Sequence, residues 1–432
     1  MTPHITVDPV RLRTDPLGLL RELARRHGAI VPFRMNGREV FLVNDPARIH
    51  EVLVSRADAF AKHQVRDRGL CLLGNGLMTS NDAANRTQRR HLAPLFSQGR
   101  LQSAIPVMAQ AAAAWRDART MGETFDMVEA MGALTLDIAA RTLLDVELDR
   151  DVQTIRSALL DCLDAVTQPD AEPRILQARR RLDALVDPFI DARRQALRRE
   201  SAESEPHDMI SLLLAAGNSD DLIRDEVVTM LLGAHETTAS ALAWTWWRLD
   251  RHRDVAAQLR QEVATHPSLE PEGGSHVTRG RCMHGGDSEA LRLPYTRAVV
   301  SETLRLHSPG WIIGRVAIRS THLGDHEVPE GAVIMMSPAV VHHDPSLYPD
   351  PQAFDPTRFL NPTSRPRWAF FPFGGGARTC IGEQFAWLEM LVVLAVVATR
   401  LRFETVPDHP IEEQALAALR PRWGIKVTPC HV

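Results

Sequence analysis

The chain has 432 residues, of which 44% are hydrophobic and 24% are charged. These proportions are typical of a large soluble enzyme with a sizeable core, although length alone does not settle the number of domains. The formal net charge of −4 gives no reason to expect a nucleic acid or an acidic membrane surface as a partner.

The N-terminal residues contain no apolar run that is long enough for a signal peptide or a membrane anchor. We therefore expect a cytoplasmic protein, with residues 1–15 as a flexible arm. The five cysteines, at positions 71, 162, 282, 380 and 430, show no paired spacing. Their distribution favours neither disulfides nor structural zinc.

An apolar run from about residue 227 to residue 249 is too long for a strand and predicts a buried helix. Glu236 and Thr237 lie midway along it, where a carboxylate and a hydroxyl cost free energy unless they are paired or used. Thr237 follows Gly233 by four residues, so its hydroxyl can bond the Gly233 carbonyl and loosen the helix. Such a distortion leaves room for water or a small ligand. Alone, the segment would indicate a bent helix without chemistry.

The stretch between residues 262 and 293 is rich in glycine and contains two prolines. This composition predicts a mobile surface loop over about residues 266–290. Its histidines and its cysteine, at positions 266, 276, 284 and 282, have a spacing that fits no common metal site.

Glu302 and Arg305 are three residues apart, so they share one face of a predicted helix. Such a pair is usually solvated, but the flanking residues here are apolar, and a buried charged pair needs further partners. Arg358, in a loop punctuated by Pro356, can complete a network of three members.

Cys380 ends the sequence Phe-Gly-Gly-Gly-Ala-Arg-Thr-Cys and precedes an apolar helix pattern from residue 383 to about residue 399. Glycines at 374–376 allow the backbone to turn and to approach a flat group closely. The amide groups of the loop can stabilise a thiolate, and Arg378 can meet an anionic group at the rim. An iron porphyrin with propionate arms meets these requirements. The alternative is an incidental cysteine before a core helix.

Taken in order, the helical acid–alcohol pair, the Glu-x-x-Arg helix, the arginine loop and the cysteine loop resemble the cytochrome P450 family. Ala386 and Glu389 also match behind the cysteine loop, and the resemblance runs from about residue 45 to residue 427. It implies a fold that is mainly α with a small β-sheet region, the cytochrome P450 fold, in a single haem domain over residues 1–432.

The resemblance implies haem b as cofactor and the Cys380 thiolate as the ligand of its iron. Arg89, Arg315 and Arg378 match positions that bind the haem propionates. Asn85 stands where the family usually has an aromatic residue or a histidine, so it brings a hydrogen-bond donor without charge and leaves Arg89 as the better candidate. Further haem-contacting positions match Phe373, Gly374, Gly382 and Gly233.

The implied reaction is monooxygenation, in which one oxygen atom from O2 enters a C–H bond of an apolar small molecule. Glu236 and Thr237 would relay protons to the reacting oxygen. A ferredoxin and a ferredoxin reductase would supply the electrons. We expect a monomer that binds neither nucleic acid nor a membrane.

Other outcomes stay open at this point. One is a haem-thiolate protein that uses peroxide or performs no redox reaction, and another is oxidative coupling on a polyketide or an aromatic peptide. The intact pair of Glu236 and Thr237 favours oxygen activation, since a site without it has no need of the pair.

The expected substrate pocket is apolar, which favours a hydrophobic ligand with few polar groups. The sequence from 76 to 80 and the one from 94 to 96 look more like those of bacterial terpene-oxidising members than those of camphor-type or macrolide-type members. We therefore expect a terpene, of sesquiterpene size. The pocket positions are Leu70, Leu72, Met78, Leu232, Trp311, Ile312, Ile313 and Ala417.

Overall fold

The computed structural model describes residues 5–35, 37–62, 72–148, 152–166, 172–199, 206–266, 292–361 and 365–432. Most of the secondary structure in these residues is helical. The helices are α1 (Pro9–Thr14), α2 (Pro16–His27), α3 (Pro46–His50), α5 (Asp82–Leu92), α6 (Gln98–Asp117), α7 (Met127–Ala139), α8 (Val152–Val166), α9 (Glu172–Arg199), α10 (Met209–Ala215), α11 (Asp220–Arg251), α12 (Arg253–Ala264), α13 (Pro294–Leu306), α14 (Pro338–Val341) and α15 (Glu383–Ala398).

The strands are short and form small sheets. They are β1 (Ile5–Thr6), β2 (Ile30–Met35), β3 (Arg38–Val43), β4 (Phe60–Lys62), β5 (Phe125–Asp126), β6 (Ile313–Ala317), β7 (Thr321–Leu323), β8 (His326–Val328), β9 (Val333–Met336), β10 (Leu401–Thr405), β11 (Glu413–Ala415), β12 (Leu419–Pro421) and β13 (Lys426–His431). The largest sheet has the order β1-β2-β3-β9-β6-β4, and β10-β13-β5 form a second one. Two hairpins, β11-β12 and β7-β8, complete the set among the described residues. The expected fold class, mainly α with small sheets, is confirmed.

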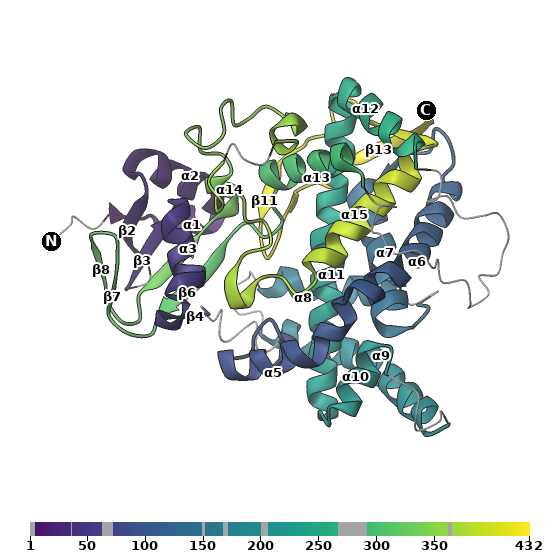
Figure 1. Ribbon diagram of the computed structural model, residues 1–432, viewed down its shortest axis with the longest axis horizontal. Helices are drawn as coiled ribbons and strands as arrows, with labels where there is room; N and C mark the ends of the chain where they lie inside the picture. Colours follow the sequence, from purple (N-terminus) through teal and green to yellow (C-terminus); the bar gives the residue numbers. More distant parts are fainter. Residues whose placement is uncertain are drawn as a thin grey trace.

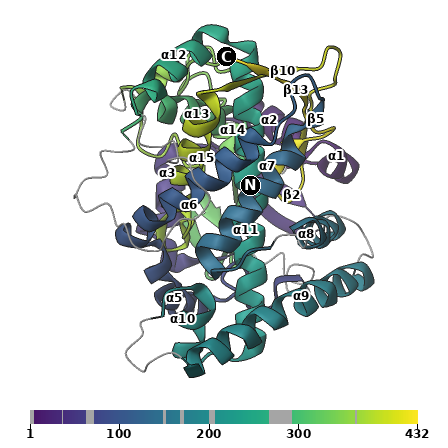
Figure 2. The same cartoon turned by 90° about the vertical axis from the view of Figure 1, so that its right-hand side faces the viewer.

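The largest sheet and the long helices occupy opposite ends of the molecule. Figure 1 shows the sheet with α1, α2 and α3 on the left and the helical part on the right. In the turned view of Figure 2, α11 again runs through the helical part, with α9 and α10 near its lower end. The segment that carries the cysteine loop connects the two ends, because it follows the sheet strands in sequence and leads into α15.

Two helices of the core are buried on almost every face. α11 begins with Asp220 and Asp221, which favour a helix N-terminus, and Ser219 accepts a hydrogen bond from the backbone N–H of Leu222. The predicted run from 227 to 249 lies inside it. α15 coincides with the predicted helix, and its residues from 389 to 398 are all buried. Side chains of both helices belong to one core cluster with α6, α7 and α13.

Residues 1–15 were expected to form a flexible arm, and residues 5–14 differ from this expectation. β1 pairs in parallel with β2. α1 is capped by Asp8, whose side chain accepts a hydrogen bond from the N–H of Val10. The apolar side chain of Val7 is buried against the largest sheet. The strand pairing, the cap and the buried side chain give residues 5–14 regular secondary structure on the largest sheet.

Two further expectations fall largely outside the described residues. These are the pocket position Leu70 and the loop at 266–290, of which only His266 is described. Within the described part of the chain, no helix is long and apolar enough to cross a membrane.

Candidate functional site

The cysteine loop turns back on itself at two glycines in the left-handed region, Gly374 (φ 73°) and Gly376 (φ 70°). The turn is closed by the N–H of Cys380, which donates to the carbonyl of Phe373 at 2.9 Å. A Cβ at Gly376 would lie 1.8 Å from the carbonyl oxygen of Leu53. The close approach at this glycine is therefore to the protein backbone, and side chains are excluded here for that reason.

Cys380 is exposed, but the protein packed around its thiol still changes the pKa of that thiol. Burial raises the pKa of the Cys380 thiol, while a hydrogen bond from the Gly382 backbone and the positive charge of Arg89 act in the opposite direction. Cys380 also lies three residues before Glu383, the first residue of α15, whose N-terminus favours negative charge. A thiolate at this position has local support from a donor and from a cation.

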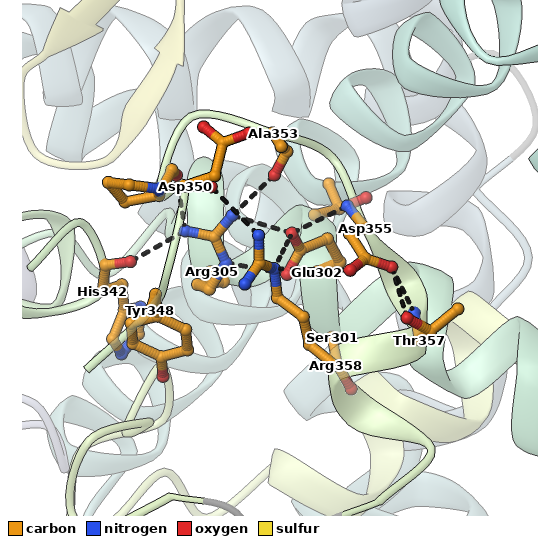
Figure 3. Close-up of polar contacts among 12 residues, drawn as sticks. Ser301, Glu302, Arg305, His342, Tyr348, Asp350, Ala353, Asp355, Thr357 and Arg358 are labelled. Carbon is orange, nitrogen blue, oxygen red and sulfur yellow. Dashed lines mark hydrogen bonds and ion pairs between the residues drawn. The ribbon is translucent and has the colours of Figure 1, made fainter. Parts of the chain in front are cut away.

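Glu302 and Arg305 are both fully buried on α13 (Figure 3). All five N–H groups of the Arg305 guanidinium donate, and the acceptors are both carboxylate oxygens of Glu302 (2.7 Å each) and the carbonyls of His342 (2.9 Å), Pro351 (2.8 Å) and Ala353 (3.0 Å). Arg358 lies 3.5 Å from Glu302, which also accepts the backbone N–H of Asp355 at 3.0 Å. The structure thus brings the three network residues together and satisfies the buried guanidinium completely.

This network is connected to the cysteine loop through His342 and Tyr348. Burial holds the pKa of His342 well below its ordinary value, so the ring is neutral and its Nε2 can accept the backbone N–H of Phe371 (3.1 Å). The hydroxyl of Tyr348 donates to the carbonyl of Ala369 (2.9 Å). Since the N–H of Gly374 in turn bonds the carbonyl of Phe371, the position of the loop depends on the network.

Four cationic side chains gather beside the cysteine loop. Arg378 donates to Asp82 and to the carbonyl of Ser80, but its buried Nη1 has no hydrogen-bond partner among the described residues. Burial and the charge of Arg378 lower the pKa of Arg315 to about 10. Burial and these two arginines lower the pKa of Lys62 to about 8.

Arg89 is the fourth cation of this group, and it donates to the carbonyl of Thr379 at 2.9 Å. The sequence analysis overlooked Lys62, which faces Arg315 across the pairing of β4 with β6. Lys62 could have been singled out in the sequence, because the chain has only two lysines, at positions 62 and 426.

Asn85 does not point its amide at the cationic group. Its Nδ2 donates to the carbonyl of Leu77 at 2.8 Å and lies 3.5 Å from the hydroxyl of Ser80. The side chain is 3% exposed. Its hydrogen bonds therefore hold the preceding segment of the chain, and they do not indicate a contact with a propionate.

The expected loosening does not break α11, which is a continuous helix through Gly233, and the structure shows instead a partly accessible stretch there, called here the opening. The hydroxyl of Thr237 donates to the Gly233 carbonyl at 2.7 Å, and Gly233, Ala234 and Thr237 are the residues that are not fully buried between positions 225 and 246. Glu236 turns to another side of the helix, where its carboxylate lies 3.5 Å from the guanidinium of Arg420 in β12. Sequence reasoning missed Arg420, which is separated from Glu236 by 184 positions.

The expected pocket residues come from four parts of the described chain. Leu72 and Leu232 are buried in one apolar cluster, and Met78 is 42% exposed. Trp311 donates from its ring N–H to the carbonyl of Leu416 (2.8 Å), which fixes the hairpin that carries Ala417. Ile312 and Ile313 are partly buried at the start of β6.

Comparison of the sequence with known proteins shows the family of the chain. The family profile described as Cytochrome P450 matches residues 9–428. The chain belongs to the cytochrome P450 family. Cyclooctatin synthase of Streptomyces melanosporofaciens is 33% identical over 94% of this chain and 89% of the relative. The cyclooctat-9-en-7-ol 5-monooxygenase of the same organism is 32% identical (91% and 86%). The cytochrome P450 monooxygenase sphH of Aspergillus fumigatus is 29% identical (96% and 84%).

Membership in the cytochrome P450 family implies a haem cofactor, and the residues present fit one. The unpartnered Nη1 of Arg378 is buried, which is costly until an acceptor such as a propionate oxygen meets it. Arg315 and Lys62 add positive charge on the same side. A soft thiolate donor at Cys380 suits iron. In this P450, Cys380 would ligate the iron and the cationic group would hold the propionates.

The Arg305→Lys variant is expected to lower the stability of this P450 by about 3–5 kcal/mol, because it leaves the buried carboxylate of Glu302 without its bidentate partner. Thermal unfolding and the yield of haem-loaded protein measure the effect. The control is Asp221→Asn in a surface pair, whose carboxylate is 89% exposed and which is expected to change stability by about 0–1 kcal/mol. Equal losses in the two variants would refute the structural role of the network.

Arg315→Gln is expected to speed the release of haem about tenfold, because it removes the charged hydrogen-bond donor that Arg315 would offer to a propionate. Transfer of haem to an excess of apomyoglobin, followed by absorbance, gives the rate. Arg319→Gln is the matched control, since Arg319 is 55% exposed and pairs with Asp58. If both variants release haem at the wild-type rate, Arg315 does not bind a propionate.

Proposed function

We propose that this protein is a haem b monooxygenase that inserts one oxygen atom from O2 into a C–H bond of a terpene, of sesquiterpene size. The observation that carries the oxygen chemistry is the opening in α11, where Thr237 bonds the Gly233 carbonyl and leaves three residues accessible on a buried helix. Thr237 at the opening and Glu236 on the neighbouring side of the helix are an alcohol and an acid, the groups that proton delivery needs.

Different residues of the chain have different roles in the proposed reaction. Bound haem supplies the iron chemistry, and Cys380 holds the iron from the side of the cysteine loop. Thr237 can turn its hydroxyl from the Gly233 carbonyl toward the reacting oxygen. Glu236 would be the group that passes protons toward Thr237, and Arg420, whose side chain is 19% exposed, holds its carboxylate in position without itself giving up a proton.

The substrate class is supported by the apolar character of the expected pocket and by two relatives. One of them is named as the 5-monooxygenase of cyclooctat-9-en-7-ol, whose name describes an unsaturated alcohol. The apolar side chains of Leu72, Leu232 and Trp311 suit a hydrocarbon skeleton. We further propose that a ferredoxin and its reductase supply the electrons, and that the enzyme is a monomer.

The proposed reaction is tested with the purified haem protein. Optical titration with farnesol, a macrolide and an aromatic dipeptide reports which ligand displaces water from the iron. Turnover with ferredoxin, its reductase and 18O2 is then compared with turnover by hydrogen peroxide alone. A spectral shift with farnesol and one labelled oxygen atom in the product are expected. Product formed only with peroxide, or only from the macrolide or the peptide, would overturn the proposal.

Thr237→Ala is expected to lower the product formed per NADPH about tenfold or more, because proton delivery to the reacting oxygen is impaired. Hydrogen peroxide released per NADPH should rise in step. Thr245→Ala is the matched control, since the hydroxyl of Thr245 makes the same bond to the carbonyl four residues earlier, at 2.7 Å to Ala241, in the buried part of α11. Equal coupling in both variants would show that Thr237 serves only the shape of the helix.

A further inference from the structure

Residues 72–80, called here the strap, lie directly on α11. Two glycines make this approach possible. A Cβ at Gly74 (φ 52°) would lie 2.2 Å from the carboxylate of Asp225, and a Cβ at Gly76 would lie 2.3 Å from the hydroxyl of Thr229. Any larger side chain at either position would push the strap away from the helix.

The close approach brings backbone N–H groups of the strap onto two carboxylates of α11. The N–H of Asn75 donates to Asp225 at 2.8 Å, and the N–H of Leu77 donates to Glu226 at 3.0 Å. Glu226 is fully buried, and burial raises the pKa of its carboxyl to about 7. The Leu77 N–H acts in the opposite direction on this pKa, so the strap stabilises the carboxylate that holds it.

The carbonyl groups of the strap are held from other elements. Arg179 of α9 donates to the carbonyl of Leu72 (2.8 Å) and also pairs with Asp225 (2.6 Å). Two side chains of α5 complete the set, with Gln88 donating to the carbonyl of Asn75 (2.7 Å) and Asn85 to that of Leu77 (2.8 Å). The strap is thus fixed on both sides of its backbone.

The strap also connects the two halves of the site. The carbonyl of Ser80, at its end, accepts from Arg378 of the cysteine loop at 2.9 Å. On α11, residues 226, 230, 233 and 237 lie within about 60° of one another around the helix axis. Glu226 is therefore on the face that carries the opening at Gly233 and Thr237, about 10 Å along the axis from Gly233. The contacts of the strap advance along α11 from Asp225 at Gly74 to Thr229 at Gly76, and Leu77 shares an apolar cluster with Leu232, the neighbour of Gly233.

We infer that Glu226 is a positioning residue for substrate binding, which holds the strap on α11 so that Leu77 and Met78 form a wall of the ligand pocket. The inference rests on the proposed function for the location of the pocket. Glu226 would therefore affect ligand affinity although it is not one of the reacting groups. Glu226 acts through the strap and does not itself touch the ligand.

Two substitutions at Glu226 separate its hydrogen bond from its charge. Glu226→Leu keeps the volume and removes the acceptor, so the Leu77 N–H loses its partner. Glu226→Gln removes the charge and keeps an acceptor oxygen for that N–H. The control is Asp221→Asn in the first turn of α11, where the carboxylate is 89% exposed.

The haem-loaded variants are titrated optically with imidazole, which needs only the iron, and with 4-phenylimidazole, whose ring must enter an apolar pocket. Glu226→Leu is expected to weaken 4-phenylimidazole about tenfold and to leave imidazole unchanged, because an unpaired buried N–H frees the strap. Glu226→Gln and the control are expected to bind both azoles as the wild type does. Amide hydrogen exchange of the peptide covering residues 72–80 should rise only in Glu226→Leu.

Gly76→Ala tests the same contact by changing the strap instead of α11. It should weaken the binding of 4-phenylimidazole to a similar extent. The double variant of Gly76→Ala with Glu226→Leu should be no weaker than either single variant, because both release the same contact. Gly99→Ala is the control, since a Cβ there meets no atom within 4 Å.

The outcomes are distinguishable from failure of the proposed function. If farnesol gives no spectral shift in the wild type but the azole pattern holds, the terpene substrate is wrong and the inference stands. Faster exchange of the strap without any loss of 4-phenylimidazole affinity would overturn the inference. Equal losses for imidazole and 4-phenylimidazole would also overturn it, because they would place the effect at the haem.

Discussion

The structure around the site depends on one buried guanidinium. Arg305 is fully buried and gives all five of its N–H groups to acceptors, three of which are backbone carbonyls between positions 342 and 353. That irregular segment then holds the cysteine loop through His342 and Tyr348. Because an uncompensated buried charge costs about 3–5 kcal/mol, the segment has one favourable position relative to α13. The loop that presents Cys380 receives its position from this constraint.

Carboxylates hold other segments in the same way, with backbone N–H groups as partners in place of carbonyls. Carboxylates on helices accept backbone N–H groups from irregular segments, from the first turn of another helix or from the end of a strand. The described examples are Glu226 with Leu77, Asp225 with Asn75, Glu302 with Asp355, Glu262 with Tyr295 and Thr296, and Asp250 with Thr405. Short strands alone cannot fix such segments. Buried helix side chains therefore set the shape of the site, although most of them touch no reacting group.

The sequence was informative where the chemistry is local. The helix of residues 383–398 follows from its continuous apolar run, and the bond from Thr237 to Gly233 follows from a spacing of four residues. It was not informative where partners are distant in the chain. Neither Arg420 beside Glu236 nor the strap on α11 has a local pattern, because each depends on how helices pack. Asn85 was assigned by position in a motif, and its amide instead serves Leu77.

The cationic group shows how folding and cofactor binding are coupled in this protein. Lys62, Arg89, Arg315 and Arg378 perturb one another or the Cys380 thiol, and the carboxylate that acts on them is Asp82. Four cations and one carboxylate leave a formal excess of three positive charges. Burial first, and the neighbouring arginines second, lower the pKa values of Lys62 and Arg315. An anionic cofactor that binds only the folded chain neutralises part of this excess charge and stabilises the fold by mass action. The stabilisation that haem adds to the fold is therefore expected to fall, together with haem occupancy, when one of these cations is removed.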